Sequence, residues 1–509
     1  MTLAFSPEPL KRFGMKTFLL KYRKFVLILI LSGAVWFAYP VARAIFFFFA
    51  DPPPSEEMTI LLDEEFADDA SRANKSPHSG IVTLSADLDE SVKLLRSALL
   101  QAKDENKSMI PMGARHSMGK QAIKENAILI NTLSMNGMSM EGELLRVQAG
   151  ARWIEVIDFL AQKSKTVEIM QSNCDFSIGG TLSVNAHGWQ PGRPPVGSSV
   201  KKITVMTADG KVLECTRAQN ADLFRHVIGG YGLFGIILEA WIKTVPNHVL
   251  TSSIQQVRPD EFPLAWEQIK REGAELAYGR LCIAPDSFFG SVLLNAFYSE
   301  DAKTDPDPRP YEIDLKAKMA RAIFRASLGS DRGKEFRHWM ETALGGEASG
   351  THTRSKLLSE PVRVFGNNDP EKRDLLFECF VPKGKFPAFV QKAREIIGKS
   401  CPTILNVTVR EITHDSDSAL PYATQDVFGL VMLFTIDRNR EAEMKTSEMA
   451  GKLIDLSTTL GGSFYLPYRN FASREQVLKA YPGFVDFLEK KRLFDPDEIF
   501  SSGFYKKYR

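Results

Sequence analysis

Two segments of this 509-residue chain carry residue types and spacings that could bind a ligand and act on it chemically. The first, PMGARHSMGKQA at 111–122, places His116 and Ser117 between two glycines, directly after an apolar, strand-like run. Such a loop can turn tightly and direct successive backbone N–H groups at one anion, for example a pyrophosphate. The candidate ligand-binding residues of this loop are Gly113, Ala114, Arg115, His116, Ser117 and Met118.

The same loop allows two other interpretations. Ser117 could be the nucleophile of a hydrolase elbow of the GxSxG type, but Arg115 occupies the first glycine position, where the strained turn has least room for a side chain. The loop could also be an ordinary turn that carries a surface histidine.

The second segment, CDFSIGGTLSVNAHGWQPGRPPVGSSV at 174–200, is rich in small residues at close spacing, with His187 among them. Small residues are required where backbone approaches a flat ligand closely. A glycine-rich connection with a structural histidine would need no ligand, so that alternative stays open. The candidate ligand-binding residues here are Ile178, Gly179, Gly180, Thr181, Ser183, Ala186 and Gly188.

A third segment, IGGYGLFGI at 228–236, has the glycine spacing of a dinucleotide-binding fingerprint. That fingerprint requires a strand before the glycines and a helix after them. Here a helical segment, NADLFRHVIGG, precedes them and a strand, IILEAWIKTVP, follows. The reversed order argues against a Rossmann NAD site.

The elements that must position these segments alternate between strand and helix up to about residue 248, which predicts an α/β or α+β domain. A β-hairpin is predicted around Asp209-Gly210. Beyond residue 250 the alternation of strands and helices becomes less regular. Residues 250–450 are predicted to be a second domain, with strand-like segments near its end. The predicted strands are 81–84, 108–113, 127–130, 144–150, 405–412 and 428–436, and the predicted helices are about 88–99, 152–163 and 473–491.

Composition limits the class of protein. Hydrophobic residues make up 44% and charged residues 25% of the chain, as in ordinary folded proteins. The net charge of +2 does not indicate a nucleic-acid partner. Five cysteines without a CxxC pair are too sparse for a disulfide framework or a zinc site, so we expect buried thiols and no metal.

Near the N-terminus, residues 25–42 are uncharged and largely apolar, and AIFFFFA follows after Arg43. This length can cross a bilayer as a helix, so residues 25 to about 49 are predicted to be a membrane anchor. Basic residues precede the run and eight acidic residues follow it within 51–70, which places the N-terminus on the cytoplasmic side and the body across the membrane. A signal peptide cleaved near Ala42-Arg43-Ala44 and a buried core helix are the alternatives. Residues 51–77 are predicted to be an acidic tether.

Four segments, in order, resemble the FAD-binding domain of the vanillyl-alcohol oxidase or PCMH superfamily. They are GARHSMGKQ, SIGGTLSVNAHG, ITVMTADGKVLE and NADLFRHVIGGYGLFGII. The second of them and the tail GGSFYLPYRNFASREQVLKAYPGF are similar to decaprenylphosphoryl ribose oxidases. GARHSMGKQA is more similar to cytokinin dehydrogenases and aldonolactone oxidases.

The resemblance implies an α+β fold with FAD as cofactor. Its parts would be an anchor at 1–50, the tether at 51–77, a two-part PCMH-type FAD-binding domain at 78–248, a cap or substrate domain at 249–450, and a C-terminal segment, 451–509, that returns to the FAD site. The glycines of the third segment would then bind FAD. The residues concerned are Gly232, Gly235, Ile236 and Ile237.

Two residues bear on covalent attachment of FAD. His116 stands where relatives with a GHS motif bond histidine to the flavin 8α carbon, although Arg115 replaces the usual preceding glycine. The ribose oxidases lack this histidine and hold FAD without a bond, so both forms stay open. Cys174 is one position too far from the IGG motif for a second link and is interpreted as a plain thiol.

The resemblance also implies residues that face the substrate. His187 aligns with a histidine near the flavin. Arg410 keeps the arginine of a Glu-x-Arg pair that has Thr408 at the glutamate position, and it could equally be a surface arginine on an edge strand. A lysine of the ribose oxidases is replaced in the tail, which offers Tyr465, Tyr468 and Arg469 instead.

The predicted activity is transfer of a hydride from an alcohol or amine C–H to flavin N5, by an oxidase or dehydrogenase whose electron acceptor the sequence does not indicate. Its substrate would be a small molecule, or a lipid-linked or membrane-soluble one. An FAD-dependent reductase of carbon double bonds and a flavin-free scaffold tethered to the membrane are the alternatives.

Overall fold

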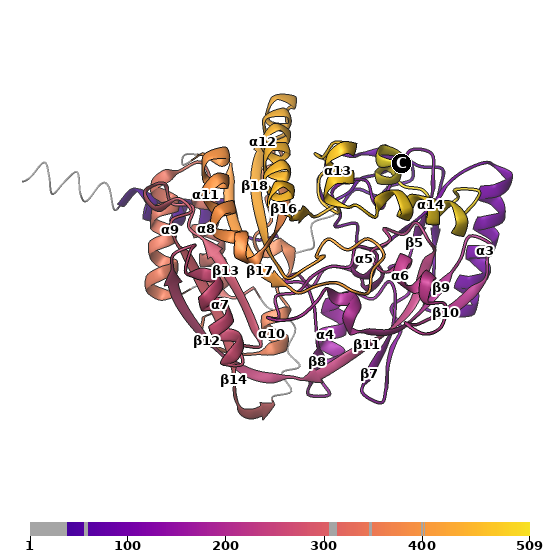
Figure 1. The fold of residues 1–509 in the computed structure, drawn as a ribbon, viewed down its shortest axis with the longest axis horizontal. Coiled ribbons are helices and arrows are strands. Elements are labelled where there is room, and N and C mark those ends of the chain that lie inside the picture. The colour runs from indigo at the N-terminus through magenta and orange to yellow at the C-terminus, as the bar shows by residue number, and fades with distance from the viewer. Residues whose placement is uncertain (1–37, 55–59, 305–312, 346–348, 399–400, 402) are drawn as a thin grey trace, which may run out of the picture.

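The computed structural model of the chain describes residues 38–54, 60–304, 313–345, 349–398, 401 and 403–509. Figure 1 shows two lobes side by side. The first lobe comprises residues 60–247 and the tail from about 460, and the second lobe comprises residues 248–459. The chain mixes helices with parallel and antiparallel sheets, as expected for an α+β fold.

The first lobe begins with a three-stranded parallel sheet in the order β3-β5-β4. Helix α3 packs on it through Leu95 and Leu99, and it begins where the Asp87 side chain accepts a hydrogen bond from the Glu90 backbone. An N-cap of this kind satisfies one of the free N–H groups of the first turn. The bounds are β3 Ile81–Thr83, α3 Leu88–Asp104, β4 Met109–Met112 and β5 Ile128–Asn131.

A six-stranded antiparallel sheet forms the rest of this lobe, in the order β10-β9-β11-β7-β6 with β8 on the far end of β11. The predicted hairpin is confirmed, because Met206 pairs with Val212 and Gly210 has a positive φ of 77° in the turn. The strands are β6 Met138–Glu141, β7 Leu144–Gln148, β8 Lys165–Val167, β9 Val200–Met206, β10 Val212–Cys215 and β11 Ile236–Pro246. The helices are α4 Trp153–Ala161, α5 Ile178–Ser183, the 3-10 turn Val196–Ser199 and α6 Ala221–Val227.

The second lobe is built on an eight-stranded antiparallel sheet in the order β15-β12-β14-β13-β17-β18-β16-β19. Phe262 of α7, Phe386 of α11 and Phe428 of β18 pack together against one face of this sheet. The strands are β12 His248–Val257, β13 Leu276–Leu281, β14 Val292–Thr304, β15 Thr351–Thr353, β16 Lys372–Pro382, β17 Ile404–Ile412, β18 Val427–Asp437 and β19 Ser463–Phe464.

Helices cover this lobe on several sides, and α8 and α9 lie at the end away from the first lobe (Figure 1). The helices are α7 Phe262–Arg271, α8 Leu315–Ala326, α9 Asp331–Leu344, α10 Arg354–Leu358, α11 Phe386–Ile397 and α12 Arg440–Thr459. Three short 3-10 turns lie at Pro285–Ser287, Val362–Val364 and Lys383–Lys385.

The tail leaves the second lobe through β19 and packs on the first. Phe487 contacts Phe234, and the backbone of Ile499 accepts a hydrogen bond from that of Met109. The single helix predicted for 473–491 is wrong in its extent, because α13 ends before Pro482, which cannot continue a helix. The helices are α13 Arg474–Ala480, α14 Phe484–Phe494 and α15 Gly503–Tyr508.

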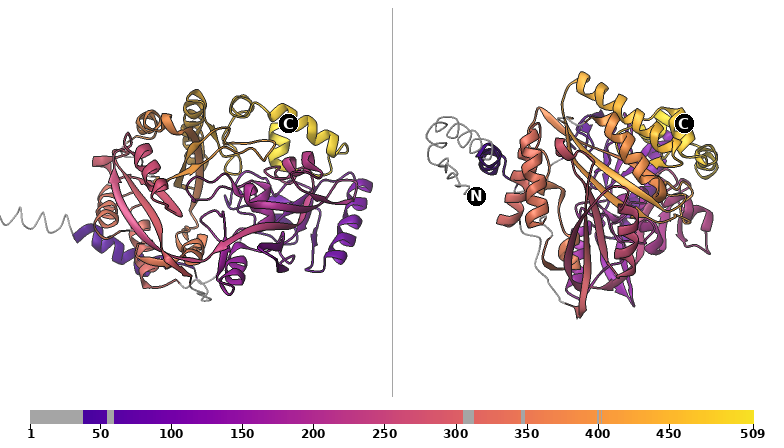
Figure 2. Two further views of the ribbon diagram at one scale, coloured as in Figure 1. Left: turned by 60° about the horizontal axis from the view of Figure 1, so that its bottom comes forward. Right: turned by 60° about the vertical axis from the view of Figure 1, so that its left-hand side comes forward.

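The predicted anchor lies largely outside the described residues, which begin at residue 38. Among the residues that are described, no helix is both long and apolar enough to span a bilayer. Residues 38–50 are helical and lie beside the second lobe in both views of Figure 2. The end of the predicted tether packs on the first lobe, where Asp69 and Asn74 are buried and β1 (Phe66–Ala67) pairs with β2 (Ser76–Pro77).

Candidate functional site

A cavity of about 1360 Å³ lies between the two lobes. Its walls come from the 113–118 loop and the 171–189 segment of the first lobe, from one face of the second lobe's sheet, from α8 and α9, and from the tail at Tyr465–Tyr468. A single ligand pocket is usually about 300–1,000 Å³, so this cavity has room for more than one ligand. The two loops that contain His116 and His187 therefore share one site, as their sequences predict.

The loop 113–118 lines one wall of this cavity along its whole length. Within the described chain, the five successive backbone N–H groups from Gly113 to Ser117 donate to no protein acceptor, whereas that of Met118 donates to the Pro467 carbonyl. Unpaired N–H groups grouped in this way suit an anion, as expected for a pyrophosphate-binding loop.

Arg115 occupies the position before His116, where the similar GHS motif has a glycine. Its φ of 55° lies in the left-handed region, which costs a residue other than glycine roughly 1–2 kcal/mol. Its guanidinium donates to the backbone carbonyls of Ile60, at 3.0 Å, and Leu61, at 2.6 Å. The side chain thus ties the start of the first lobe to the loop, which offsets the backbone strain.

His116 faces the cavity and packs on Phe176, with the ring centroids 4.5 Å apart. Burial, with the charges of Arg115 and Arg152 adding to it, lowers the pKa of His116 to about 4. The imidazole is therefore neutral at pH 7, and a neutral nitrogen has the lone pair that bonding to an electrophilic carbon requires.

The segment around α5 forms the next wall. Five of its predicted residues line the cavity: Gly179, Gly180, Thr181, Ser183 and Ala186. Ile178 and Gly188 do not line it; Ile178 is buried in the core, and a Cβ on Gly188 would collide with Gln190. Similarly, a Cβ on Gly113 or Gly179 would collide with Ser177 or Ala149, so packing within the chain already requires these two glycines.

The third glycine segment contributes Gly232, Gly235 and Ile237 to the cavity, while Ile236 points into the core behind the parallel sheet. Adjacent residues of a strand face opposite sides of a sheet, so only one of the two isoleucines can reach the cavity. Both glycines have positive φ, at 73° and 154°, and they connect α6 to β11 without a Rossmann turn.

The opposite wall is one face of the second lobe's sheet. Arg280 on β13 pairs with Thr408 on β17, Thr408 with Val431 on β18, and Val431 with Glu378 on β16. Paired residues share a face, so these four side chains form a row that faces the first lobe. Glu411, next to Arg410, lies on the other face and pairs with Lys270, at 2.9 Å, and with Lys383.

His187 meets this row at Glu378. Nε2 of His187 lies 2.8 Å from Oε1 of Glu378, and the Glu378 side chain is 0% exposed. Neither carboxylate oxygen accepts a well-aligned hydrogen bond from the described residues. A buried carboxylate is costly unless it is paired, so the imidazole is the group that compensates it. The rings of Phe380, Tyr422 and Tyr465 surround His187 with centroids 5.7 to 6.2 Å away.

Three further predicted residues line the same part of the cavity: Tyr465, Tyr468 and Arg410. Burial raises the pKa of Tyr468 and of Tyr465, so both keep their hydroxyl protons. The Arg410 Nη2 donates to Ser172 at 2.7 Å, while its buried Nε has no acceptor among the described residues.

Arg469 does not reach the cavity. It forms an ion pair with Glu443 of α12 and donates to Asn74 at 3.0 Å, so it joins the tail to the second lobe. The position of Arg469 therefore does not support its predicted role facing the substrate.

The sequence did not single out several residues of the cavity wall. Glu378 has the clearest signal, since it is the one acid inside the apolar strand segment LLFECFVP. Beyond it, Arg280 lies 3.3 Å from Glu341 of α9, which also pairs with Arg337 at 2.9 Å. These charges come from separate elements, so no local spacing reveals them.

Comparison with known proteins bears on the cofactor. Residues 89–216 match the family described as FAD binding domain. Cytokinin dehydrogenase 2 of Arabidopsis thaliana is 34% identical over 29% of this chain and 30% of its own length. D-arabinono-1,4-lactone oxidase of Candida glabrata is 24% identical over 48% and 49%, and cytokinin dehydrogenase 1 of Oryza sativa subsp. japonica is 24% identical over 77% and 80%. The match thus spans under half the length of the first two relatives.

These findings confirm the predicted resemblance to FAD-linked oxidases of the vanillyl-alcohol oxidase or PCMH superfamily, with FAD as the cofactor. The cavity fits this cofactor, because its loop offers unpaired N–H groups for a pyrophosphate and the small residues of α5 line the adjoining wall. Cys174 donates to the Ser359 carbonyl at 3.1 Å and does not line the cavity, as expected for a plain thiol. No group of metal-ligating side chains occurs among the described residues.

Proposed function

We propose that this chain, which resembles the vanillyl-alcohol oxidase or PCMH superfamily and matches an FAD binding domain at 89–216, is an oxidase or dehydrogenase that oxidises an alcohol or amine C–H. One observation carries this proposal: the anion-binding loop and His187, whose ring contacts the buried Glu378, line the same cavity. A flavin-free scaffold would have no need of five unpaired N–H groups beside a buried acid and histidine.

FAD, when bound, supplies the acceptor for the two electrons of the substrate C–H bond. The chain has to hold the cofactor, orient the substrate, exclude water and accept the proton that leaves the alcohol or amine. The loop 113–117 would hold the pyrophosphate, and the residues Gly179 to Ala186 would pack along the flat part of the cofactor.

His187 is suited to accept the substrate proton. Its Nε2 contacts Glu378 Oε1, and its Nδ1 lies 3.2 Å from the Gly188 carbonyl oxygen. Once the imidazole has accepted the substrate proton, each of its two N–H groups would have an acceptor. A positioned base of this kind contributes about 10²- to 10⁴-fold to a rate. Glu378 has no cavity surface of its own and would act by holding the imidazole in place.

Arg410 and Tyr468 are suited to orient the substrate and to stabilise negative charge. Arg410 has a buried, unpaired Nε at the cavity wall, and a fixed cation in such a place is effective because water does not screen it. Tyr468 keeps its proton and can donate a hydrogen bond to a substrate oxygen.

The covalent state of FAD is also a proposal. His116 is neutral at pH 7, lines the cavity beside the anion-binding loop, and matches the position at which relatives with a GHS motif attach the flavin. We infer that a His116 nitrogen would replace one hydrogen of the flavin 8α methyl group; the C–H bond is broken, its proton is released, and the two electrons reduce the flavin, which the electron acceptor of the proposed activity would reoxidise. Acid precipitation tests this, because a covalently bound flavin stays with the pellet and a noncovalent one washes out.

The substrate is proposed to be an amphipathic, membrane-soluble or lipid-linked molecule. The lining of the cavity combines polar side chains, among them Arg280 and Asn295, with apolar side chains of α8 such as Met319 and Ile323. The apolar sequence at 25–37 supports attachment of the chain to a membrane, while residues 38–50, the rest of the expected anchor, pack against the second lobe. The charges on either side favour a cytoplasmic N-terminus with the body on the far side.

The test is rapid mixing of the full-length chain with a panel of alcohols and amines in the absence of oxygen. The proposal expects bleaching of the oxidised flavin band by at least one amphipathic alcohol or amine, with the aldehyde, ketone or imine as product. If the flavin is reduced only by an external reductant and then reoxidised by an unsaturated substrate, the chain is a double-bond reductase.

A further inference from the structure

Exposed apolar side chains gather at one end of the second lobe. Among the described residues, nine of the seventeen large hydrophobic side chains that are exposed belong to the helical residues 38–50 and to α8 and α9. We call this group the mouth surface. Its members are Tyr39, Val41, Ile45, Phe46, Phe49, Leu315, Met319, Trp339 and Leu344.

The helix 38–50 is held firmly against α8. Arg43 donates to the carbonyls of Ala326 and Leu328 at 2.7 and 2.8 Å. At the end of this helix, Asp51 accepts from Arg321 at 2.8 Å and from Asn368 at 2.8 Å.

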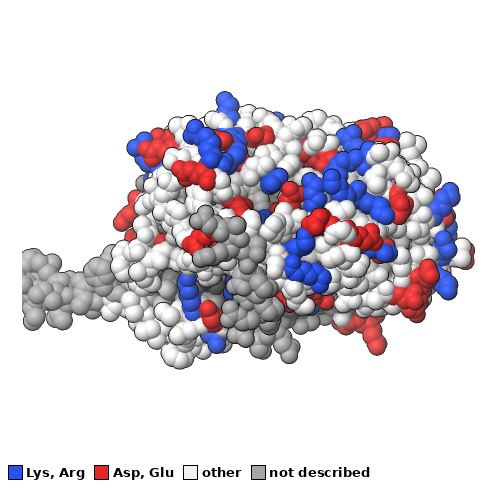
Figure 3. All heavy atoms as spheres, turned by 90° about the horizontal axis from the view of Figure 1, so that it is seen from below, with Lys and Arg blue, Asp and Glu red and all other residues white. Residues whose placement is uncertain are grey.

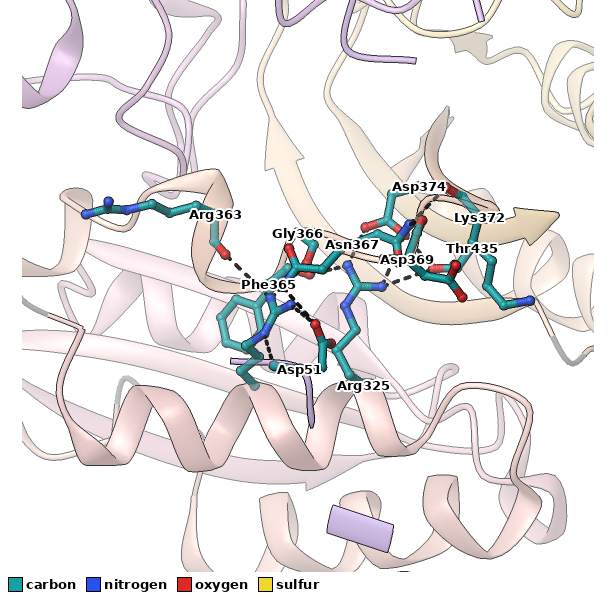
Figure 4. A network of polar contacts seen from close by, with 12 residues as sticks. Asp51, Arg325, Arg363, Phe365, Gly366, Asn367, Asp369, Lys372, Asp374 and Thr435 are labelled. Carbon is teal, nitrogen blue, oxygen red and sulfur yellow. Dashed lines mark hydrogen bonds and ion pairs between the residues drawn. The ribbon is translucent and has the colours of Figure 1, made fainter. Parts of the chain in front are cut away.

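The network continues into the second lobe's sheet. In Figure 4, Arg325 of α8 lies between Asp51 and Asp374, and its side chain pairs with Asp374 at 2.5 Å. Asp374 also accepts from Thr435 of β18. These polar contacts therefore fix the orientation of the helix 38–50 relative to the cavity.

The mouth surface is also the rim of the cavity. Leu315, Met319 and Leu344 are 64%, 49% and 66% exposed, and all three line the cavity. Further inside, Ile323 and Phe324 of α8 continue the apolar lining. The cavity thus reaches the surface where the exposed apolar side chains are densest.

The chemistry of this surface fits a lipid bilayer. Exposed apolar patches of this kind mark contact sites, and a rim of basic side chains beside aromatic and aliphatic ones is typical of helices that lie in a membrane interface. The exposed basic residues here are Lys316, Lys318 and Arg332, and the exposed acidic ones are Asp314 and Asp331. The ring of Trp339 lies 6.0 Å from that of Phe336, centroid to centroid. Figure 3 shows the surface at the base of the N-terminal trace as largely uncharged.

The sequence that leads into this surface points to the same partner. Residues 25–37, FVLILILSGAVWF, contain no charge and continue directly into the helix 38–50. An apolar run that enters a bilayer at residue 37 would bring Tyr39, Phe46 and Trp339 to its interface, where aromatic side chains are enriched. A soluble partner protein would not account for this continuity.

We propose that the mouth surface lies in the boundary between headgroups and acyl chains, so that the cavity receives its substrate directly from the bilayer. This inference rests on the proposed function for the identity of the substrate site, but its test does not require turnover. Such a surface is expected to sit about 5–10 Å into the headgroup and acyl boundary.

The experiment places an environment-sensitive fluorophore, NBD, on single introduced cysteines of the full-length chain. Leu344→Cys reports on the mouth surface, and Leu100→Cys of α3 is the matched control, because the two leucines are 66% and 65% exposed and lie on opposite lobes. Four of the native cysteines are buried, and the labelled wild-type chain gives the background from the fifth, Cys401. Trp339→Cys supplies a second reporter in case Leu344→Cys loses its bound flavin.

The labelled proteins are bound to vesicles of phosphatidylcholine and phosphatidylglycerol, with or without bromine on the acyl chains. The proposal expects brominated lipid to remove most of the emission at positions 344 and 339 and to leave that at position 100 unchanged. Equal, weak quenching at all three positions in vesicle-bound protein would overturn it while leaving the anchor intact. A chain that does not bind vesicles at all would overturn both, and flavin reduction would still test the proposed activity separately.

Discussion

Replacing Glu378 by Gln tests whether the buried His187–Glu378 pair does chemistry in the cavity. Glutamine keeps the shape of the side chain but removes the charge that compensates the imidazole. We take the stabilisation of the protonated imidazole by the carboxylate as equal to that of a hydrogen bond to a charged group, about 1.5–3 kcal/mol. Its loss corresponds to a roughly 10- to 150-fold slower reduction of the flavin. His187→Ala removes the proton acceptor itself, so its loss should be about 10²- to 10⁴-fold.

The assay is single-turnover flavin reduction by rapid mixing, with FAD content measured on the same samples. Because Glu378 acts through His187, the double variant should be no slower than His187→Ala alone. Glu411→Gln is the matched control, since it removes an equally buried glutamate from the opposite face of the same sheet and should leave the reduction rate unchanged.

Three results would refute the reasoning. Glu378→Gln within two-fold of the wild type would mean that the charge is irrelevant to the rate. Additive losses in the double variant would mean that the two residues act independently. A similar loss in Glu411→Gln would mean that any buried charge in this sheet affects the rate through stability alone.

Further predictions concern the loop and the tail. His116→Ala should bind FAD but release it on acid precipitation; flavin that stays in the pellet would place the bond elsewhere. In flavin-free protein, His116 has a folded pKa of about 4 against 6.5 when unfolded, so acidification from pH 6.5 to 4 favours the unfolded chain, and His116→Phe should flatten that fall in a pH series of denaturant melts. Tyr468→Phe should slow flavin reduction about 10-fold, the loss of one hydrogen bond, at unchanged FAD content. Arg115→Gly should free the segment at Ile60 and increase its hydrogen exchange, and unchanged exchange there would contradict the anchoring role.

Much of the first lobe could be predicted from local patterns. The strands at 109–112 and 128–131, the hairpin at Asp209-Gly210 and the order of helix and strand around 221–246 follow from apolar runs, turn residues and caps. Each of these features is determined by residues close together in sequence. The glycine-rich loops were also found, because backbone geometry restricts which residues can occupy them.

The rest of the candidate site depends on contacts between residues far apart in the sequence, which local sequence patterns do not predict. Glu378 meets His187 only because β16 packs against the 171–189 segment beside the cavity. Arg469 was predicted to face the substrate, yet it forms an ion pair with Glu443 of α12 and does not line the cavity. The separate roles of Ile236 and Ile237 follow from the pleat of β11, and a one-residue shift in register would reverse them.

Whether the chain binds FAD and passes substrate electrons to it can be measured from the visible absorption spectrum of the full-length chain, purified after expression with ample flavin. The account predicts the two absorption bands of an oxidised flavin at one FAD per chain, with the longer-wavelength band bleached on anaerobic addition of an amphipathic alcohol or amine that is a substrate. A folded chain that stays colourless would contradict it, because the unpaired N–H groups of 113–117 would then need another ligand.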